Sequence, residues 1–487
     1  MTESTSASLI RALQAIVPPD QVIHQQEALR PYECDALSAK RRLPQVVCLP
    51  DDLAQLRAVL RLCHEWDVPV VARGAGTGLS GGALPPARGV LLSLTRFTRV
   101  LEVDPRNRTA RVEPGVRNVS ISEAAAPYGL YYAPDPSSQI ACTIGGNVAE
   151  NSGGVHCLKY GLTVHNILGL KVLTMEGDLL EIGGQSLDSP GYDLLALLTG
   201  SEGLLGILTE ITVKLLPRPE GVAVLLGAFP DIAAAAATVG AIIAAGIIPA
   251  GLELMDQLAI QAAEDFIHAG YPRDAAAILL CELDGGRAEL EIQLQQVATL
   301  LRQGGATTLQ HAETAQARQR LWAGRKAAFP AAGRLAPDYY CMDGTIPRHR
   351  LAEVLEQITA WATEYGLRVA NVFHAGDGNL HPLILYDANR PGELEKAEAF
   401  GARILELCVA VGGAITGEHG VGVEKLDQMC RQFGKAELAQ FHQIKDAFDP
   451  AGLLNPGKAI PTLHRCAELG AMHVHGGKLP FPELERF

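Results

Sequence analysis

The chain of 487 residues is long enough for two or three domains, each with its own hydrophobic core. Its 41 basic and 54 acidic residues give a net charge of −13, which argues against nucleic acid or an anionic membrane surface as the main partner. Ten cysteines are scattered without a C-x-x-C pair, which argues against a disulfide scaffold, a zinc ribbon or a ligated iron–sulfur cluster.

The sequence predicts a soluble, cytoplasmic protein with no membrane span. The N-terminus lacks the basic-then-apolar pattern of a signal peptide. The longest charge-free apolar run, residues 232–248, is interrupted by Gly240 and Gly246 and ends at Pro249. This run favours a buried helix followed by a strand over a membrane helix.

The first residues are predicted to precede a cofactor domain. We expect residues 1–45 to form an N-terminal helical segment and residues 53–66 to form a helix whose N-cap is supplied by Asp51 and Asp52. A short strand at residues 68–71 then leads directly into a glycine-rich loop at residues 73–82.

The loop at residues 73–82 is predicted to bind phosphate. Its five glycines let backbone N–H groups crowd around an anion without interference from Cβ atoms. Residues 76–81 also match the dinucleotide pattern G-x-G-x-x-G, and Glu102 follows about twenty residues later. We reject a Rossmann fold because such a fingerprint opens a helix. Here the loop continues through Pro85 and Pro86 into a predicted strand at residues 90–94.

The rest of the first half alternates predicted hairpins with clusters of small residues. One hairpin is expected at residues 100–113 and another at residues 168–182. Small-residue clusters occupy residues 134–138, 143–154 and 200–207. A strand from residue 207 to 216 ends at Pro217 and Pro219, which predicts a domain boundary near residue 220.

In this order, the four clusters resemble the FAD-binding domain of the vanillyl-alcohol oxidase superfamily, in its branch of D-2-hydroxy-acid dehydrogenases. The resemblance implies an α+β FAD-binding domain over residues 46–220, with the pyrophosphate on the 73–82 loop and the isoalloxazine near residues 135–154. We expect the FAD to be non-covalent because the 73–82 loop contains no His or Cys, and we expect His156 and Cys157 to be bystanders. The implied FAD-binding residues are Arg73, Gly74, Ala75, Gly76, Thr77, Gly78, Ser80, Gly81, Pro134, Asp135, Ser138, Thr143, Gly146, Asn147, Asn151, Gly153, Gly154, Glu202, Gly206, Ile207 and Asn455.

From residue 221 the pattern changes to strands alternating with helices. This alternation predicts an α+β cap domain over residues 221–460, with an antiparallel sheet and helices on one face. A C-terminal tail at residues 461–487 contains His464, Cys466, His473 and His475. We expect the tail to dock on the cap or on a partner, and favour this over a second metal site.

Two glycine-bracketed loops in the second half carry the candidate chemistry. His374 and His381 bracket one loop between predicted strands, and Glu418 and His419 occupy the other. Two imidazoles and one carboxylate suit Zn²⁺ or Mn²⁺ with positions open for substrate, although single histidines are more often structural. Arg325 lies among apolar neighbours, where it either solvates at a helix surface or clamps a carboxylate.

Both loops, together with residues 322–343 and the tail, resemble the glycolate-oxidising members of the same branch. The resemblance implies His374, His381 and Glu418 as metal ligands. His419 cannot easily bind the same ion as its neighbour, so we expect it to be the catalytic base, and we expect Arg325 to anchor the substrate carboxylate. It also implies oxidation of a small 2-hydroxy acid, glycolate to glyoxylate, with a second flavoprotein subunit and an iron–sulfur subunit passing electrons to an acceptor other than oxygen. Such partners would place the protein on the inner face of the cell membrane as a peripheral component.

Two alternatives remain open at this stage. One is a D-lactate or other D-2-hydroxy-acid dehydrogenase, and Cys341, where the 2-hydroxyglutarate enzymes offer a Lys, favours a small substrate over 2-hydroxyglutarate. The other is a non-catalytic flavin subunit of an electron-transfer complex, which the intact set of His374, His381, Glu418 and His419 disfavours.

Overall fold

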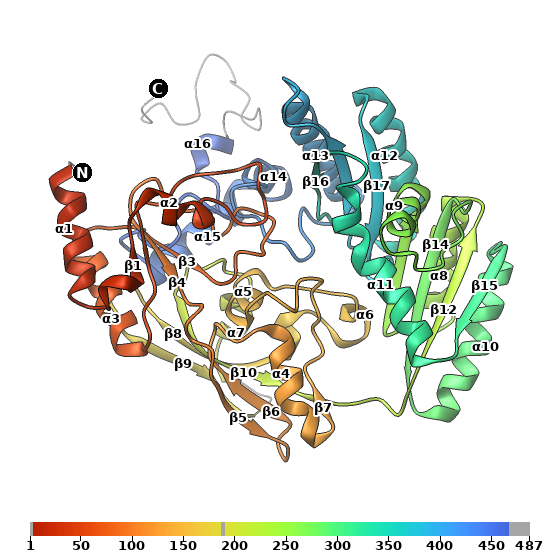
Figure 1. Ribbon diagram of the computed structural model, residues 1–487, viewed down its shortest axis with the longest axis horizontal. Coiled ribbons are helices and arrows are strands. Elements are labelled where there is room, and N and C mark those ends of the chain that lie inside the picture. The colour runs from red at the N-terminus through yellow and green to blue at the C-terminus, as the bar shows by residue number, and fades with distance from the viewer. Residues whose placement is uncertain (1–2, 187–189, 467–487) are drawn as a thin grey trace.

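The computed structural model describes residues 3–186 and 190–466. Residues 3–217 form what we call the N-terminal half, and residues 221–410 form the cap, which lies on the other side of the molecule (Figure 1). The last described residues, 426–466, cross back to the N-terminal half, and we call them the C-terminal return.

A small mixed sheet begins the N-terminal half. The sheet has the order β1-β2-β4-β3, with β2 and β3 parallel to β4 and β1 antiparallel to β2. The predicted helix near residue 53 is confirmed as α3, with Asp52 accepting a hydrogen bond from Gln55 N and Leu56 and Leu60 buried. The elements of this layer are α1 (Glu3–Gln14), β1 (Val22–Ile23), α2 (Gln26–Leu29), β2 (Val46–Cys48), α3 (Leu53–Glu65), β3 (Val70–Arg73) and β4 (Val90–Ser93).

The N-terminal segment belongs to the same core as the helix and strands that follow it. Leu9 and Leu13 of α1 pack with α3 and with Val70 and Val90 of the sheet. The connection from β3 to β4 contains no helix, which confirms that the glycine-rich loop is not a Rossmann fingerprint.

A five-stranded antiparallel sheet completes the N-terminal half. Both predicted hairpins are confirmed, as β5–β6 and β8–β9, and β10 lies between them in the order β5-β6-β10-β8-β9. The elements are β5 (Val100–Asp104), β6 (Thr109–Val112), α4 (Asn118–Ala125), β7 (Leu130–Tyr131), α5 (Ile144–Glu150), α6 (Cys157–Tyr160), β8 (Ile167–Leu173), β9 (Leu179–Gly183), α7 (Leu194–Leu198), β10 (Ile207–Lys214) and β11 (Leu216–Pro217).

The cap is built on a seven-stranded antiparallel sheet in the order β15-β12-β14-β13-β17-β18-β16. Asp231 and Asp256 cap the two helices that follow β12 and β13. The elements are β12 (Gly221–Phe229), α8 (Ile232–Ala244), β13 (Gly251–Asp256), α9 (Gln257–Ile267), β14 (Ala277–Gly285), α10 (Arg287–Gln303), β15 (Thr308–Ala312), α11 (Ala315–Ala332), β16 (Asp338–Cys341), α12 (Leu351–Tyr365), β17 (Arg368–Phe373), β18 (Pro382–Tyr386) and α13 (Glu393–Ala410).

Helices cover both faces of the cap sheet, so the expectation of helices on one face is wrong. Leu225 and Phe229 of β12 pack with α8, α12 and α13, whereas Val224 and Leu226 pack with α9 and α11. Because side chains alternate along a strand, a continuously apolar strand such as β12 requires cover on both sides.

The C-terminal return joins the core of the N-terminal half. It contains α14 (Leu426–Gln432), α15 (Lys435–Phe448) and α16 (Leu463–Cys466). Leu453 and Leu454 pack in the same core as α3, and Asn455 N donates a hydrogen bond to Val70 O. A disulfide joins Cys430 of α14 to Cys466 of α16. The predicted tail lies outside the described residues from position 467 onward, including His473 and His475. None of the described helices is long and apolar enough to cross a membrane.

Candidate active site

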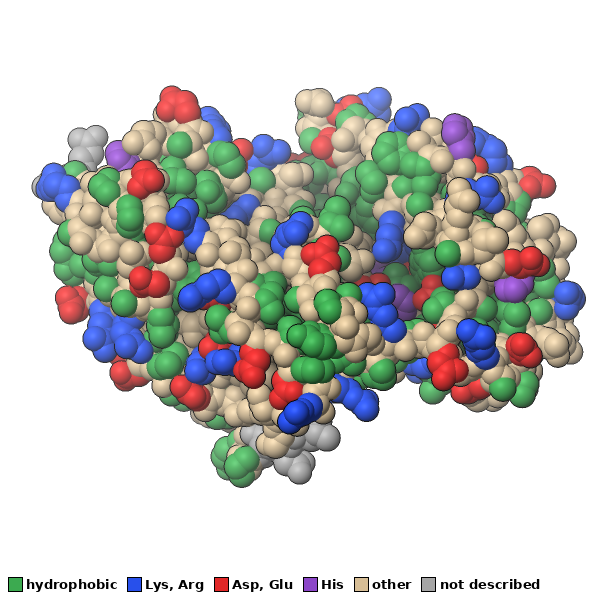
Figure 2. All heavy atoms as spheres, turned by 60° about the horizontal axis from the view of Figure 1, so that its bottom comes forward, with side chains coloured by type: hydrophobic (Ala, Val, Ile, Leu, Met, Phe, Trp, Pro, Cys, Tyr) green, Lys and Arg blue, Asp and Glu red, His purple; other side chains and the backbone are tan. Residues whose placement is uncertain are grey.

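A cavity of about 500 Å³ lies where the N-terminal half, the cap and the loop after the cap meet. The surface is hollowed between the two halves, as Figure 2 shows. Its lining includes loop and helix residues of the N-terminal half, Lys326 and Phe329 of α11, Tyr339 of β16, and the side chains of His381 and His419.

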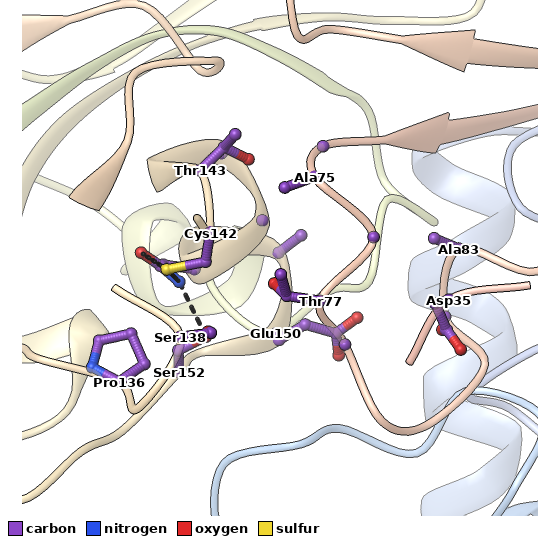
Figure 3. Close-up of a pocket in the computed structure, with 18 of the residues that line it drawn as sticks. Asp35, Ala75, Thr77, Ala83, Pro136, Ser138, Cys142, Thr143, Glu150 and Ser152 are labelled. Carbon is purple, nitrogen blue, oxygen red and sulfur yellow. Dashed lines mark hydrogen bonds between the residues drawn. The ribbon is translucent and has the colours of Figure 1, made fainter. Parts of the chain in front are cut away.

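The wall contributed by the N-terminal half is made largely of glycine and small residues. Ala75 and Thr77 of the loop after β3 face Thr143 and Glu150 at the two ends of α5 (Figure 3). A methyl group on Gly74 would lie 2.2 Å from Thr143 Oγ1, and Gly76 has a φ of +72°. The sequence uses glycine here because the backbone must approach α5 closely and adopt a left-handed conformation.

These residues fit an FAD pyrophosphate. The loop brings its backbone to the cavity wall, and Thr143 Oγ1 is buried without a hydrogen-bond partner among the described residues. Such an unpaired buried hydroxyl is costly unless a ligand satisfies it. Of the predicted FAD-binding residues, those that line the cavity are Arg73, Gly74, Ala75, Gly76, Thr77, Gly78, Ser138, Thr143, Gly146, Asn147, Glu202, Gly206 and Ile207.

The other predicted FAD-binding residues do not line the cavity, and several of them make contacts elsewhere. Asn455 donates hydrogen bonds to Gly82 O and Glu202 O, and Asn151 Oδ1 accepts one from Val164 N. Asp135 pairs with His156 at 2.9 Å. The residues outside the lining are Ser80, Gly81, Pro134, Asp135, Asn151, Gly153, Gly154 and Asn455.

Two acidic residues that line the cavity, Glu150 and Asp35, were not predicted from the sequence. Burial raises the pKa of Glu150 well above its usual range, with Glu202 adding to the shift, and burial also raises the pKa of Asp35. Figure 3 shows Glu150 beside Thr77, and Asp35 near Ala83. No local pattern identifies Asp35, since it enters the wall from a loop of the N-terminal segment.

On the cap side, His374, His381 and Glu418 form a compact donor set. Glu418 Oε1 lies 3.4 Å from His374 Nε2 and 3.2 Å from His381 Nε2. The two histidines are held at the ends of β17 and β18, and the donor atoms of all three residues lie within 4.8 Å of one another. Two imidazoles and a carboxylate in this arrangement fit a divalent cation such as Zn²⁺ or Mn²⁺.

A second possible donor set contains Asp343, His381 and His419, but Asp343 already has other partners. Asp343 accepts hydrogen bonds from the backbone of the loop that carries Glu418, and its Oδ2 lies 3.0 Å from Lys425 Nζ. A carboxylate engaged in this way has little capacity left for a cation. The set with Glu418 is therefore the better cation site.

Glu253 orients His374 of the candidate donor set. Its Oε1 lies 2.7 Å from His374 Nδ1, which leaves His374 Nε2 turned toward Glu418. Burial alone would raise the pKa of Glu253, but His374 and Arg325 outweigh it and lower the pKa. A carboxylate behind a ligating histidine fixes the tautomer and the direction of the ring. The sequence signal was an acid inside the apolar strand β13, because buried acids are almost always paired.

Arg325 is placed one layer behind the cavity. Its side chain is only 2% exposed, and Nη2 lies 2.7 Å from Glu253 Oε2. Arg325 does not line the cavity, whereas the neighbouring Lys326 of α11 does. The structure therefore links Arg325 to His374 through Glu253, and its role as a carboxylate anchor stays a prediction.

His419 is neutral and borders the cavity. Its ring stacks on His381 with centroids 5.0 Å apart and an interplanar angle of 5°. Burial lowers the pKa of His419 to about 4, although Asp343 opposes the shift. Its Nδ1 has no hydrogen-bond partner in the part of the chain that the structure describes. A neutral imidazole with a free ring nitrogen can accept a proton.

Solved structures of other proteins share this fold. A structure of p-cresol methylhydroxylase with substrate bound is similar with a TM-score of 0.79 and 18% identity, covering 95% of this chain and 98% of that chain. A structure of alkyldihydroxyacetonephosphate synthase has a TM-score of 0.74 and 19% identity, covering 93% and 86%. Because the sequences are only 18% and 19% identical, the structural similarity establishes the fold alone.

Sequence comparison identifies the family to which the chain belongs. The family described as "FAD binding domain" matches residues 44–183, and "FAD linked oxidases, C-terminal domain" matches residues 218–459. Glycolate oxidase subunit GlcD of Escherichia coli (strain K12) is 62% identical over 99% of this chain and 96% of the relative. GlcD of Bacillus subtilis (strain 168) is 41% identical over 88% and 91%, and a D-lactate dehydrogenase of Archaeoglobus fulgidus is 34% identical over 91% and 98%. The chain belongs to the FAD-linked oxidases, which confirms the predicted fold class, the FAD cofactor and the oxidoreductase class.

Proposed function

We propose that the protein oxidises a small 2-hydroxy acid, with glycolate as the first candidate, to the corresponding 2-oxo acid. The observation that carries this proposal is that the glycine-lined FAD wall faces His381, Glu418 and the neutral His419 across one cavity, with His374 completing the donor set behind them. Relatives named as glycolate oxidase subunits and as D-lactate dehydrogenases support a hydroxy acid as substrate.

Bound FAD would supply a two-electron acceptor for oxidation at C2 of the substrate. His374, His381 and Glu418 would hold a divalent cation, whose Lewis acidity would favour ionisation of the substrate hydroxyl. His419 takes the hydroxyl proton, since its imidazole is neutral near pH 7 and borders the cavity. Lys326 brings a cationic side chain to the lining, and Arg325 holds Glu253 and through it His374.

We further propose that the FAD is held without a covalent bond. The 73–82 loop has no His or Cys, and the described lining includes neither His156 nor Cys157. His156 is instead engaged by Asp135 and by Glu282 of the cap. The names of the GlcD relatives support work as one subunit of a larger assembly, in which a second flavoprotein and an iron–sulfur subunit would carry electrons onward. Such an assembly would hold the protein in the cytoplasm, on the inner face of the cell membrane.

The test is anaerobic mixing of the purified protein with glycolate, D-lactate, L-lactate or D-2-hydroxyglutarate while the flavin absorbance is followed. We expect glycolate to reduce the flavin fastest, and faster reduction by D-lactate would reassign the substrate. Bound metal without reduction by any of the four acids would instead favour a non-catalytic flavin subunit.

Replacing His419 tests the assignment of the base. In His419→Asn, we expect the rate of flavin reduction to fall about 100- to 10,000-fold, the usual contribution of a general base, while FAD stays bound. His442→Asn, which changes a histidine of α15 that contacts Pro461 O outside the lining, is the control. Reduction of His419→Asn at the rate of the control would contradict the assignment.

A further inference from the structure

The loop that carries Glu418 and His419 has no regular secondary structure of its own. Residues 417–422 lie between the end of α13 in the cap and the start of α14 in the C-terminal return. The backbone N–H groups of such a loop must find acceptors elsewhere when they are buried. Their partners therefore show what holds the candidate metal ligand and base in place.

Asp343 of the cap holds the first part of this loop. Its carboxylate accepts hydrogen bonds from Gly417 N at 3.1 Å, Glu418 N at 3.1 Å and His419 N at 2.9 Å. Asp343 is completely buried, and its charge is balanced by the equally buried Lys425 at 3.0 Å. Hydrogen bonds from amides to an ionised carboxylate are shorter and stronger than those between neutral groups.

Glu202 of the N-terminal half holds the second part. Its Oε1 accepts a hydrogen bond from Val421 N and its Oε2 one from Gly422 N, both at 2.7 Å. The backbone of Glu202 has a φ of +51°, which is a costly conformation for a residue with a side chain. Asn455 Nδ2 donates to Glu202 O at 2.6 Å and helps to maintain that conformation.

Between the two groups, Gly420 passes close to the N-terminal half. Its φ is +79°, and a methyl group there would lie 2.1 Å from Glu150 Oε2 and 3.0 Å from Glu202 Oε1. The loop is thus enclosed on one side by an acid of the cap and on the other by acids of the N-terminal half. Its shape is determined by both parts of the molecule at once.

We infer that Glu202 and Asp343 are positioning residues, which from opposite halves hold the 417–422 loop so that Glu418 meets His374 and His381 and His419 faces the cavity. The inference rests on the proposed function, since it assigns a purpose to the placement of the metal site and base. It also gives Glu202 a role beyond the FAD contact that its place in the lining suggests. In this role neither carboxylate binds the metal or the substrate.

The test measures Zn²⁺ affinity of the FAD-saturated protein by competition with a chromophoric chelator. In Glu202→Gln the new amide NH₂ faces a backbone N–H, so one hydrogen bond is replaced by repulsion between two donors. We expect Zn²⁺ affinity to fall about 10- to 100-fold, the range found when groups that orient metal ligands are removed. Flavin reduction at limiting Zn²⁺ should slow and should recover toward the wild-type rate when Zn²⁺ is in excess.

Asp343→Asn provides a second variant from the other half, with the same expected loss of Zn²⁺ affinity. The matched control is Glu113→Gln, which removes a buried carboxylate of the N-terminal half that pairs with Arg99 and, among the described residues, forms no hydrogen bond with the loop. The control should lose thermal stability but keep the wild-type Zn²⁺ affinity. A loss of stability without a loss of affinity in both loop variants would overturn the inference.

The same measurements separate this inference from the proposed function. Wild-type protein that neither binds Zn²⁺ tightly nor is reduced by any hydroxy acid would contradict the proposed function. Wild-type protein that does both, with Glu202→Gln and Asp343→Asn within twofold of its Zn²⁺ affinity, would contradict the inference alone.

Discussion

The wall of the cavity from the N-terminal half is built mainly from backbone and small side chains, with a few buried acids, whereas the opposite wall carries imidazole, carboxylate and aromatic side chains. The first wall includes Gly74 and Thr143, and the second includes His381 and Glu418. Shape complementarity therefore governs the FAD side, and charge and proton occupancy govern the cap side. A substitution in one wall should weaken binding of one ligand and leave the other ligand's binding unchanged, because the two walls contact different ligands.

Removing an imidazole from the cap wall should have the largest effect. In His381→Ala we expect loss of Zn²⁺ and a fall of about a thousandfold in the rate of flavin reduction, since a Lewis acid contributes several kcal/mol. FAD content should be unchanged, because FAD is held by the other wall. Metal analysis and anaerobic stopped-flow absorbance measure both quantities.

His311→Ala, which removes an exposed histidine from β15, is the control for the loss of an imidazole. His381→Ala with the Zn²⁺ affinity of this control would remove His381 from the donor set. Concurrent loss of FAD would show that the two walls are not separable.

Filling the FAD wall should give the converse result. A methyl group in Gly74→Ala overlaps Thr143 Oγ1, and we expect such overpacking to weaken FAD binding by about 3 kcal/mol, or roughly 150-fold. Zn²⁺ affinity should stay at the wild-type value. The measurement is titration of the apoprotein with FAD by fluorescence quenching.

The control for this change is Gly184→Ala, since no atom lies within 4 Å of the added methyl group at that position. If Gly74→Ala binds FAD as tightly as Gly184→Ala, the close approach of the loop to α5 is not what shapes the FAD wall.

The contrast between the walls also explains what the sequence could predict. The glycine clusters and the two histidine-bearing loops are contiguous in the chain, so local pattern and family resemblance were enough to find them. The helix α3, the hairpins and the antiparallel cap sheet were likewise visible in local periodicity and turn residues.

What the sequence did not reveal are partners that are distant along the chain. Glu253 and His374 are separated by 121 positions, and Glu202 and Val421 by 219. The first pair forms when β13 and β17 come together in the cap sheet, and the second forms when the N-terminal half meets the loop after the cap. No local pattern encodes either pairing. The environment of Arg325 is of the same kind, because its pairing with Glu253 arises only when β13 packs beside α11.

His156 lies between the N-terminal half and the cap. Replacing it should have a smaller effect than the substitutions in either wall. It pairs with Asp135 of the N-terminal half and with Glu282 of the cap, each at 2.9 Å. Burial alone would lower the pKa of His156, but the two carboxylates outweigh burial and raise the pKa well above its usual value of about 6.5.

The charged His156 therefore stabilises the folded protein fully below about pH 6.5, and this stabilisation disappears as the pH rises through the raised pKa of the folded state. In His156→Gln we expect a loss of about 2 kcal/mol at pH 6, the value of hydrogen bonds to charged groups, and a smaller loss at higher pH. Thermal unfolding followed by flavin fluorescence at a series of pH values measures the difference, with His349→Gln as an exposed control. A pH-independent difference would show that His156 contributes through packing alone. A stability difference that declines as the pH rises would show that the charge on His156 helps to hold the cap against the N-terminal half.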